Sequence, residues 1–171
     1  MSDMLFECKK CGSCCGGLFV YEHGVVSGLS LTEEEAKLFE PKQVAPYMAI
    51  GDEKPRTIFF YQLTLTDCPQ INEKNECKIY EKRPLICRAF PVHPKFGRAE
   101  IMPRCPQVGR YFSGVGTKCP VYIDDDKIET AVRQIILNAL IWKQKCKQER
   151  LKLWIFDLAT KRWIVDNNPP A

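Results

Sequence analysis

The stretch FECKKCGSCCGG at residues 6–17 places Cys8, Cys11, Cys14 and Cys15 within a single short segment. Glycines stand inside and directly after this segment, at positions 12, 16 and 17. Small residues let a backbone curl around an ion and aim several sulfur atoms inward, so thiols at this spacing usually hold a metal. We therefore interpret the stretch as a metal-binding turn.

A second set of cysteines lies in the middle of the chain, at Cys68, Cys77, Cys87 and Cys105. Together the two sets supply enough thiols for two four-sulfur sites, and we expect sulfurs from both sets to converge in space. We predict metal ligation by both sets. The alternative is that some of these thiols are buried as small apolar residues.

The spacing Cys8-x2-Cys11-x2-Cys14 matches the first three ligands of a bacterial ferredoxin run, whose fourth cysteine is more distant and is followed by proline. This chain departs from that run because Cys15 comes at once after Cys14. Structural zinc sites commonly use two C-x2–4-C knuckles, which the second set lacks. The pattern therefore favours a [4Fe-4S] cluster, with Zn²⁺ as the alternative.

Size and composition indicate one folded domain, because the chain has 171 residues of which 45% are apolar. No apolar run is long enough for a membrane helix, and the beginning MSDMLFEC lacks the features of a signal peptide. The net charge is +4 without a dense basic block, which disfavours a nucleic-acid partner. We expect a metal ion or cluster as the partner and no membrane association.

The chain has ten cysteines and no recognisable export signal, which indicates thiols kept reduced in the cytoplasm. Clustered thiols in a reducing compartment point to metal ligation more than to disulfides. Intracellular proteins of hyperthermophiles are the exception. That exception applies best to Cys119 and Cys146, which lie outside the two sets.

The predicted fold class is α+β: a small, irregular, cysteine-rich metal-binding domain with short strands, packed on a long C-terminal helix and a terminal β-hairpin. Apolar residues from Ile128 to Leu140 recur at helical spacing and predict a core-forming helix over residues 125–147. The alternating tail at 151–166 predicts the hairpin. We expect a single domain over 1–171, with a metal-binding region at 6–109 and the helix and hairpin at 120–171.

Shorter elements are predicted in the front region. Thr32 and Glu35 form a capping-box pattern that begins a helix of about two turns, which Pro41 ends. Residues 57–66 read as a strand, whereas residues 44–56 carry Pro46 and read as irregular. Residues 83–89 predict one or two helical turns that carry Cys87.

Four segments in order, FECKKCGSCC, DCPQI, CKIYEKRPLICRAFP and RCPQVG, resemble the CxxCxxCC family, a zinc- or iron-chelating domain. The resemblance covers Phe6 to Gly109. It implies eight metal-binding cysteines: Cys8, Cys11, Cys14, Cys15, Cys68, Cys77, Cys87 and Cys105. The same cysteine region occurs in flagellin lysine N-methylases, so kinship also implies a possible methyltransferase role.

Three functions remain open at this point. The first is a metal-binding protein with one or two cysteine-ligated centres, and the second is an enzyme, a methyltransferase or redox protein, that uses the centre. The chain has no glycine-rich nucleotide motif and no phosphate loop to support the second. The third is metal delivery or sensing through exposed thiolates. Arg83 and Arg88 flank Cys87 and could offset thiolate charge, while His23 and His93 are secondary candidate ligands.

Overall fold

The computed structural model describes residues 4–5, 8–22, 24–95, 98–102, 105–109, 121–122 and 126–166. The fold is mixed α+β and cysteine-rich, as predicted. The chain forms two compact units, each built from two segments. We name them the cysteine unit, Met1–Gly16 with Gln70–Ile136, and the sheet unit, Gly17–Pro69 with Leu137–Ala171. The expected single domain stays a prediction, and each unit is described by itself.

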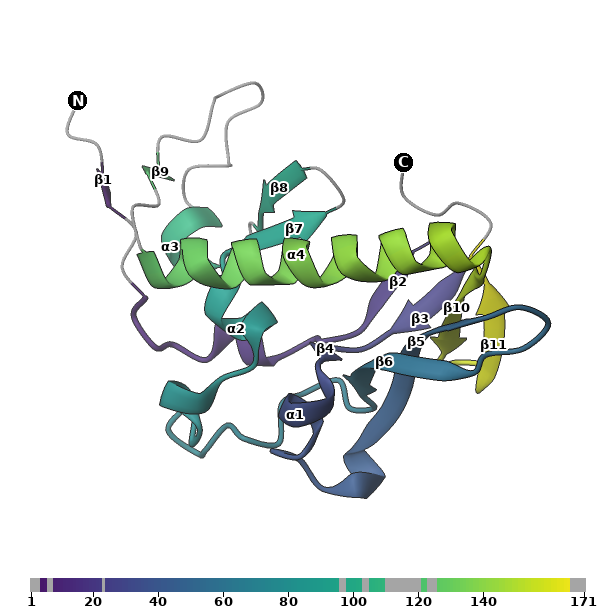
Figure 1. Ribbon diagram of the computed structural model, residues 1–171. Helices are drawn as coiled ribbons and strands as arrows, with labels where there is room; N and C mark the ends of the chain where they lie inside the picture. The colour runs from purple at the N-terminus through teal and green to yellow at the C-terminus, as the bar shows by residue number, and fades with distance from the viewer. Residues whose placement is uncertain are drawn as a thin grey trace. The chain divides into compact units, whose positions relative to one another are not determined.

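A five-stranded antiparallel sheet forms the centre of the sheet unit (Figure 1). Its order is β11-β10-β5-β6-β4, so the C-terminal hairpin pairs with a strand from the front of the chain. The strands are β4 (Ser30–Leu31), β5 (Val44–Gly51), β6 (Thr57–Leu63), β10 (Lys152–Asp157) and β11 (Arg162–Val165). A separate hairpin joins β2 (Val20–Glu22) to β3 (Val25–Ser27). The predicted terminal hairpin and the predicted strand beginning at residue 57 are confirmed.

The prediction that residues 44–56 are irregular is wrong, because most of them form β5 in the middle of the sheet. Proline is rare in central strands because it cannot donate a ladder hydrogen bond. Here the pairing of β5 with β6 shifts register between Pro46 and Met48. The side-chain amide of Gln62, which is fully buried, donates to the Pro46 carbonyl at 2.8 Å and to the Phe156 carbonyl at 2.9 Å. The bulge and this buried amide accommodate the proline.

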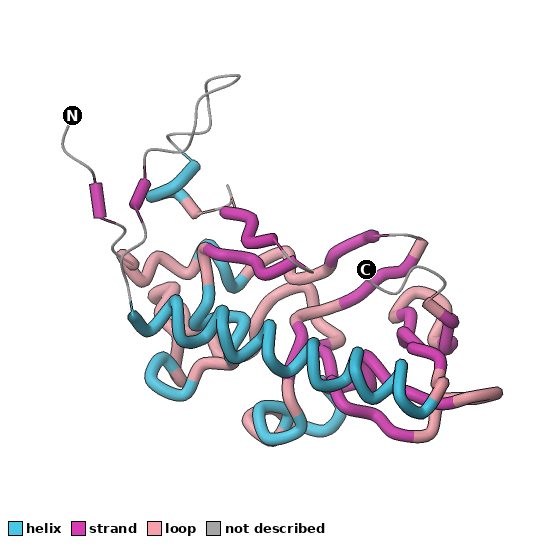
Figure 2. Tube along the Cα trace, turned by 45° about the horizontal axis from the view of Figure 1, so that its top comes forward, coloured by secondary structure: helices cyan, strands magenta, loops and turns pink. Residues whose placement is uncertain are grey.

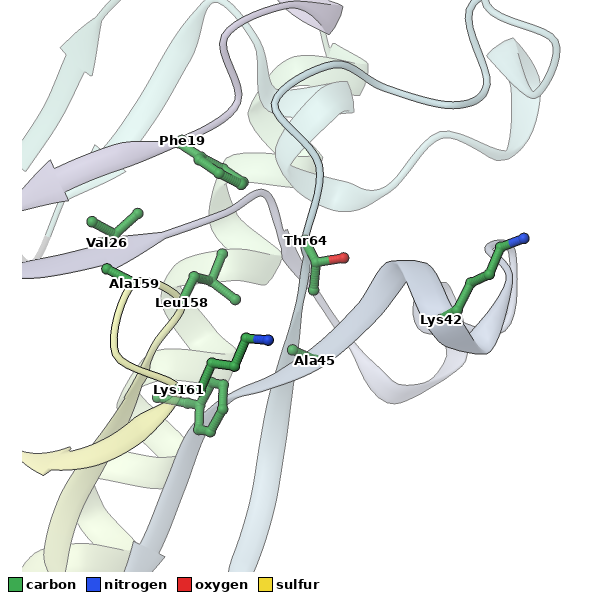
Figure 3. Close-up of a pocket in the computed structure, with 9 residues that line it drawn as sticks. Phe19, Val26, Lys42, Ala45, Thr64, Leu158, Ala159 and Lys161 are labelled. Atoms are coloured by element: carbon green, nitrogen blue, oxygen red, sulfur yellow. The ribbon is translucent and has the colours of Figure 1, made fainter.

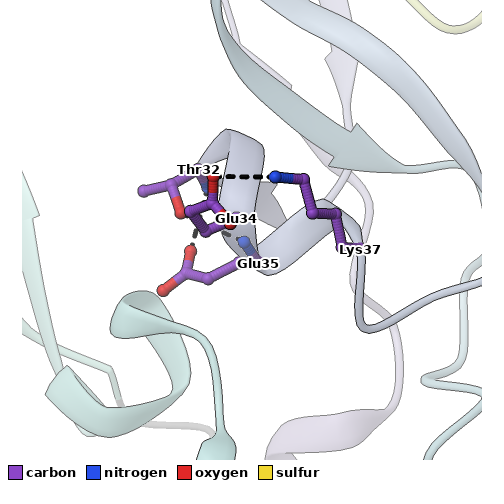
Figure 4. A network of polar contacts seen from close by, with 4 residues as sticks. All are labelled: Thr32, Glu34, Glu35 and Lys37. Carbon is purple, nitrogen blue, oxygen red and sulfur yellow. Dashed lines mark hydrogen bonds and ion pairs between the residues drawn. The ribbon is translucent and has the colours of Figure 1, made fainter.

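Helix α1 (Glu33–Ala36) begins with the predicted capping box (Figure 4). The Thr32 hydroxyl accepts from the Glu35 backbone N–H at 3.3 Å, and the Glu35 carboxylate accepts from the Thr32 N–H at 2.9 Å. The helix is shorter than the two turns expected. The chain instead enters a 3₁₀ turn, η2 (Pro41–Gln43), at the proline that was predicted to end it.

Apart from residues 126–136, which belong to a long helix, the cysteine unit consists of short elements (Figure 2). Its helical turns are η1 (Ser13–Cys15), η3 (Tyr80–Lys82), α2 (Leu85–Ala89) and α3 (Pro106–Gly109). Its strands are β1 (Met4–Leu5), paired in parallel with β9 (Val121–Tyr122), and β7 (Val92–Lys95), paired with β8 (Arg98–Ile101). The turn α2 confirms the prediction for residues 83–89, and the β7–β8 hairpin was not predicted.

The long helix α4 (Asp126–Glu149) confirms the prediction for residues 125–147. The prediction of which face of α4 is buried is only partly right. Ile128 and Ala131 are buried, but Ile136 and Leu140 are 37% and 53% exposed. Further along, Trp142 stacks on Phe59 of β6 with ring centroids 4.4 Å apart, so the helix buries a face rotated away from Leu140. Among the described helices, none is both long enough and apolar enough to span a membrane.

The two units differ in what they bury. The described buried residues of the sheet unit include the large apolar side chains Leu18, Val25, Leu31, Phe39, Ile50 and Leu63. Those of the cysteine unit are mostly smaller: Pro84, Ala89, Pro91, Cys105, Val108, Ile128 and Ala131. The cysteine unit therefore has the smaller apolar core among the described residues.

Candidate metal centre

Seven of the eight predicted ligands belong to the cysteine unit, and Cys68 belongs to the sheet unit. Cys8 and Cys11 are exposed, Cys105 is buried, and the others are half-buried. Nine of the ten cysteines are described, and each is a thiol. Cys119 and His23 lie outside the described residues.

The first cysteine turn is closed by local hydrogen bonds. The backbone N–H of Cys15 donates to the Gly12 carbonyl at 2.8 Å, and the thiol of Cys11 donates to the Ser13 hydroxyl at 3.3 Å. Gly12 has φ +73°, a left-handed conformation that favours glycine. The sequence prediction that small residues let this segment curl is thus realised at Gly12.

A second turn, residues 71–77, packs directly against the first. A Cβ placed on Gly12 would lie 2.7 Å from the Asn75 carbonyl oxygen and 2.7 Å from Cδ1 of Ile71. The Asn72 side chain closes this second turn by accepting from the backbone N–H of Glu76 at 2.8 Å, and Ile71 and Cys77 form an isolated β-bridge. The close approach brings the segment of the first four cysteines beside the segment that carries Cys77.

Tyr80 makes a second connection between these segments. The Lys10 ammonium lies 4.4 Å from the centre of the Tyr80 ring, and the Arg83 guanidinium carbon lies 3.8 Å from it. Burial raises the pKa of Tyr80 above its ordinary value, Arg83 opposes that change, and Cys8 adds to it. We name Lys10, Tyr80 and Arg83 the tyrosine clamp.

The sequence did not single out this clamp. Arg83 was considered there as a residue that flanks Cys87 and could offset thiolate charge. In the structure Arg83 stacks on Tyr80, and its Nε also donates to the Tyr80 carbonyl at 2.9 Å. The pattern Tyr-x2-Arg, with the residues three apart in a helical turn, was the available signal.

No group of three or more cysteine, histidine or acidic side chains within the described residues is arranged so that it could hold a metal ion. The eight-cysteine ligand set therefore stays a prediction. The donor chemistry fits both candidate metals, because thiolate sulfur binds zinc and iron–sulfur clusters alike. The close contact of Gly12 with Asn75 and Ile71 places the segment of the first four cysteines beside the segment that carries Cys77.

The family comparison decides what kind of protein carries this arrangement. Residues 7–147 match the family CxxCxxCC, described as a "putative zinc- or iron-chelating domain". The chain belongs to the CxxCxxCC family. The match reaches beyond Gly109, where the sequence resemblance was thought to stop, and so includes Cys119, Cys146 and most of α4. No curated protein matches the chain, and no solved structure does.

Membership in CxxCxxCC supports metal binding in general. Cys146, which the family match includes, lies on α4 and is half-buried. Burial, followed by the nearby Glu149 carboxylate, raises the pKa of its thiol. A raised thiol pKa opposes formation of the thiolate that a metal needs, so Cys146 is a useful non-ligand control.

Proposed function

We propose that this CxxCxxCC protein holds one or two cysteine-ligated metal centres that stabilise its cysteine unit. The proposed ligands are Cys8, Cys11, Cys14, Cys15, Cys68, Cys77, Cys87 and Cys105. One observation carries the proposal: seven of these thiols belong to a unit whose described residues include few large buried apolar side chains. A unit of that kind needs another source of stability.

A bound metal would supply that stability by cross-linking chain segments that are distant in sequence. Structural zinc contributes on the order of 10 kcal/mol to the folding of small domains. In this chain, the Gly12 turn would present the first four thiols, and the tyrosine clamp would hold that turn beside Cys77. Lys10 and Arg83 bring two positive charges to the Tyr80 ring.

A [4Fe-4S] cluster is the preferred centre, with Zn²⁺ as the alternative. The support is the Cys8-x2-Cys11-x2-Cys14 spacing together with the lack of a C-x2–4-C knuckle in the second cysteine set. The family description includes both zinc and iron and so leaves this choice to experiment.

Anaerobic purification with counting of iron, zinc and acid-labile sulfide tests the proposal. A brown protein that absorbs at about 400 nm and contains iron and sulfide would support a cluster. A colourless protein with stoichiometric zinc would support the alternative centre. A folded protein with neither metal above trace would refute the proposal.

A pair of cysteine variants tests the ligand set. Cys11→Ser should lose bound metal, because serine oxygen is a poor substitute for thiolate at these centres. Cys146→Ser should keep the wild-type metal content, because Cys146 lies outside the proposed set. Equal metal content in both variants would remove Cys11 from the ligands.

We also propose that the protein works in the cytoplasm. The support is the set of nine described cysteines, all of them thiols, which suits a reducing compartment.

A further inference from the structure

A hollow in the sheet unit has no part in the proposed metal chemistry. It has a volume of about 640 Å³, within the range of small-molecule sites. Its walls come from the β2–β3 hairpin, from β5 and β10, and from the turn between β10 and β11. Its apolar lining includes Phe19, Val26, Phe156 and Leu158.

The charged groups on the wall all have one sign. Lys42 and Lys161 line the hollow, and the described lining residues include no carboxylate. Figure 3 shows Lys161 extending from the hairpin turn toward Ala45 and Thr64. Lys42 is paired with Glu40 at 2.9 Å. No ion pair of Lys161 is found with the described residues, so Lys161 is the cation available to a ligand.

Hydrogen bonds hold both sides of the hollow. On one side, the Leu158 N–H donates to the Val26 carbonyl at 3.0 Å, and the Val26 N–H donates to the Asp157 carboxylate at 2.8 Å. On the other side, the Thr64 N–H donates to the Gln43 carbonyl at 2.9 Å, beside Lys42. Because these hydrogen bonds already order the wall, binding of a ligand does not require the entropy cost of ordering it.

We propose that this hollow binds a small amphiphilic organic anion. The aromatic or aliphatic body of the ligand packs against Phe19, Phe156 and Leu158, and its carboxylate or sulfonate pairs with Lys161. Thr64 also lines the hollow. The proposal does not depend on the metal centre, which involves other residues.

Titration of the purified, metal-containing protein with 8-anilinonaphthalene-1-sulfonate tests the proposal. This aromatic anion fluoresces when it enters an apolar site, and we expect one saturable site per chain. Lys161→Gln should weaken binding of this probe roughly three- to tenfold. That factor corresponds to the loss of one partly exposed ion pair of about 0.6–1.4 kcal/mol. Lys152→Gln, an exposed lysine of β10 that does not line the hollow, should leave the affinity unchanged.

Two further measurements separate the hollow from other binding. Uncharged N-phenyl-1-naphthylamine should bind wild type and Lys161→Gln equally, because it makes no ion pair. Ala159→Trp, at an exposed turn position on the wall, should block both probes while the melting temperature stays at the wild-type value. Anion binding that neither Lys161→Gln nor Ala159→Trp weakens would overturn the proposal.

Discussion

At the scale of single residues, the carboxylate of Asp157 accepts four hydrogen bonds. Asp157 is only 2% exposed, and its carboxylate accepts from the N–H groups of Val26, Ala159 and Thr160 and from the Thr160 hydroxyl. The bond from the Thr160 hydroxyl is the largest cause that lowers the pKa of Asp157, and the backbone N–H groups add to it. This carboxylate therefore ties the end of β10 to β3.

Asp157→Asn should lower the free energy of unfolding of the sheet unit by about 1–3 kcal/mol, because an amide offers one acceptor oxygen to four donors. In wild type, the lowered pKa means that the folded state binds fewer protons than the unfolded state. The contribution of Asp157 is thus complete above about pH 4 and is lost as the pH falls through the lowered pKa. Urea unfolding followed by the fluorescence of Trp154 and Trp163 at several pH values measures both effects.

The variant should lose this acid dependence, whereas replacement of the exposed Asp52 by asparagine should keep it. Identical pH profiles for wild type and Asp157→Asn would contradict the assignment.

The tyrosine clamp gives a second prediction at this scale. Tyr80→Ala removes a ring that meets two cations, each contact being worth about 0.5–1 kcal/mol, so metal should be released to a chelator roughly five- to thirtyfold more readily. Tyr80→Phe keeps the ring and loses only the hydroxyl, so its effect should be smaller. Competition with a zinc- or iron-binding dye measures the release. Tyr21→Ala, at a position 74% exposed in the sheet unit, is the control and should behave as wild type.

At the scale of elements, the contact between the two turns of the cysteine unit depends on Gly12. Gly12→Ala should destabilise the unit for two reasons: its φ of +73° strains an alanine, and the new Cβ meets the Asn75 carbonyl oxygen. Gly24→Ala shares the first cost, with φ +80°, but nothing lies within 4 Å of its Cβ. Metal retention should fall in Gly12→Ala and stay normal in Gly24→Ala. Equal retention would mean that the turns do not depend on this close approach.

Element types with strong local signals were predictable from the sequence. The capping box at Thr32 and the apolar period of α4 act through neighbouring residues, and both are found as expected. The strand β5 was missed because Pro46 normally marks irregular chain, and its cost is offset by Gln62, which lies on the next strand. The face that α4 buries was also predicted only in part. The apolar pattern of a helix does not show which of two neighbouring faces packs against the rest of the protein.

At the scale of the whole molecule, the sequence predicts the type of site better than its geometry. Cysteine spacing led to the family that the comparison confirms. The contact of Gly12 with Asn75 and the stacking of Lys10 on Tyr80 join residues more than sixty positions apart, and nothing in the local pattern encodes them. The eight predicted ligands are divided between the units, seven in the cysteine unit and Cys68 in the sheet unit, and this division depends on the tertiary fold.

The central claim is that metal ligation replaces apolar packing in the cysteine unit. Amide hydrogen exchange of the protein before and after metal removal by a chelator tests it most directly. We predict that residues 8–15 and 70–89 lose protection when metal is removed, while β5, β6 and β10 keep theirs. Unchanged exchange in residues 8–15 and 70–89 after complete metal removal would contradict the account.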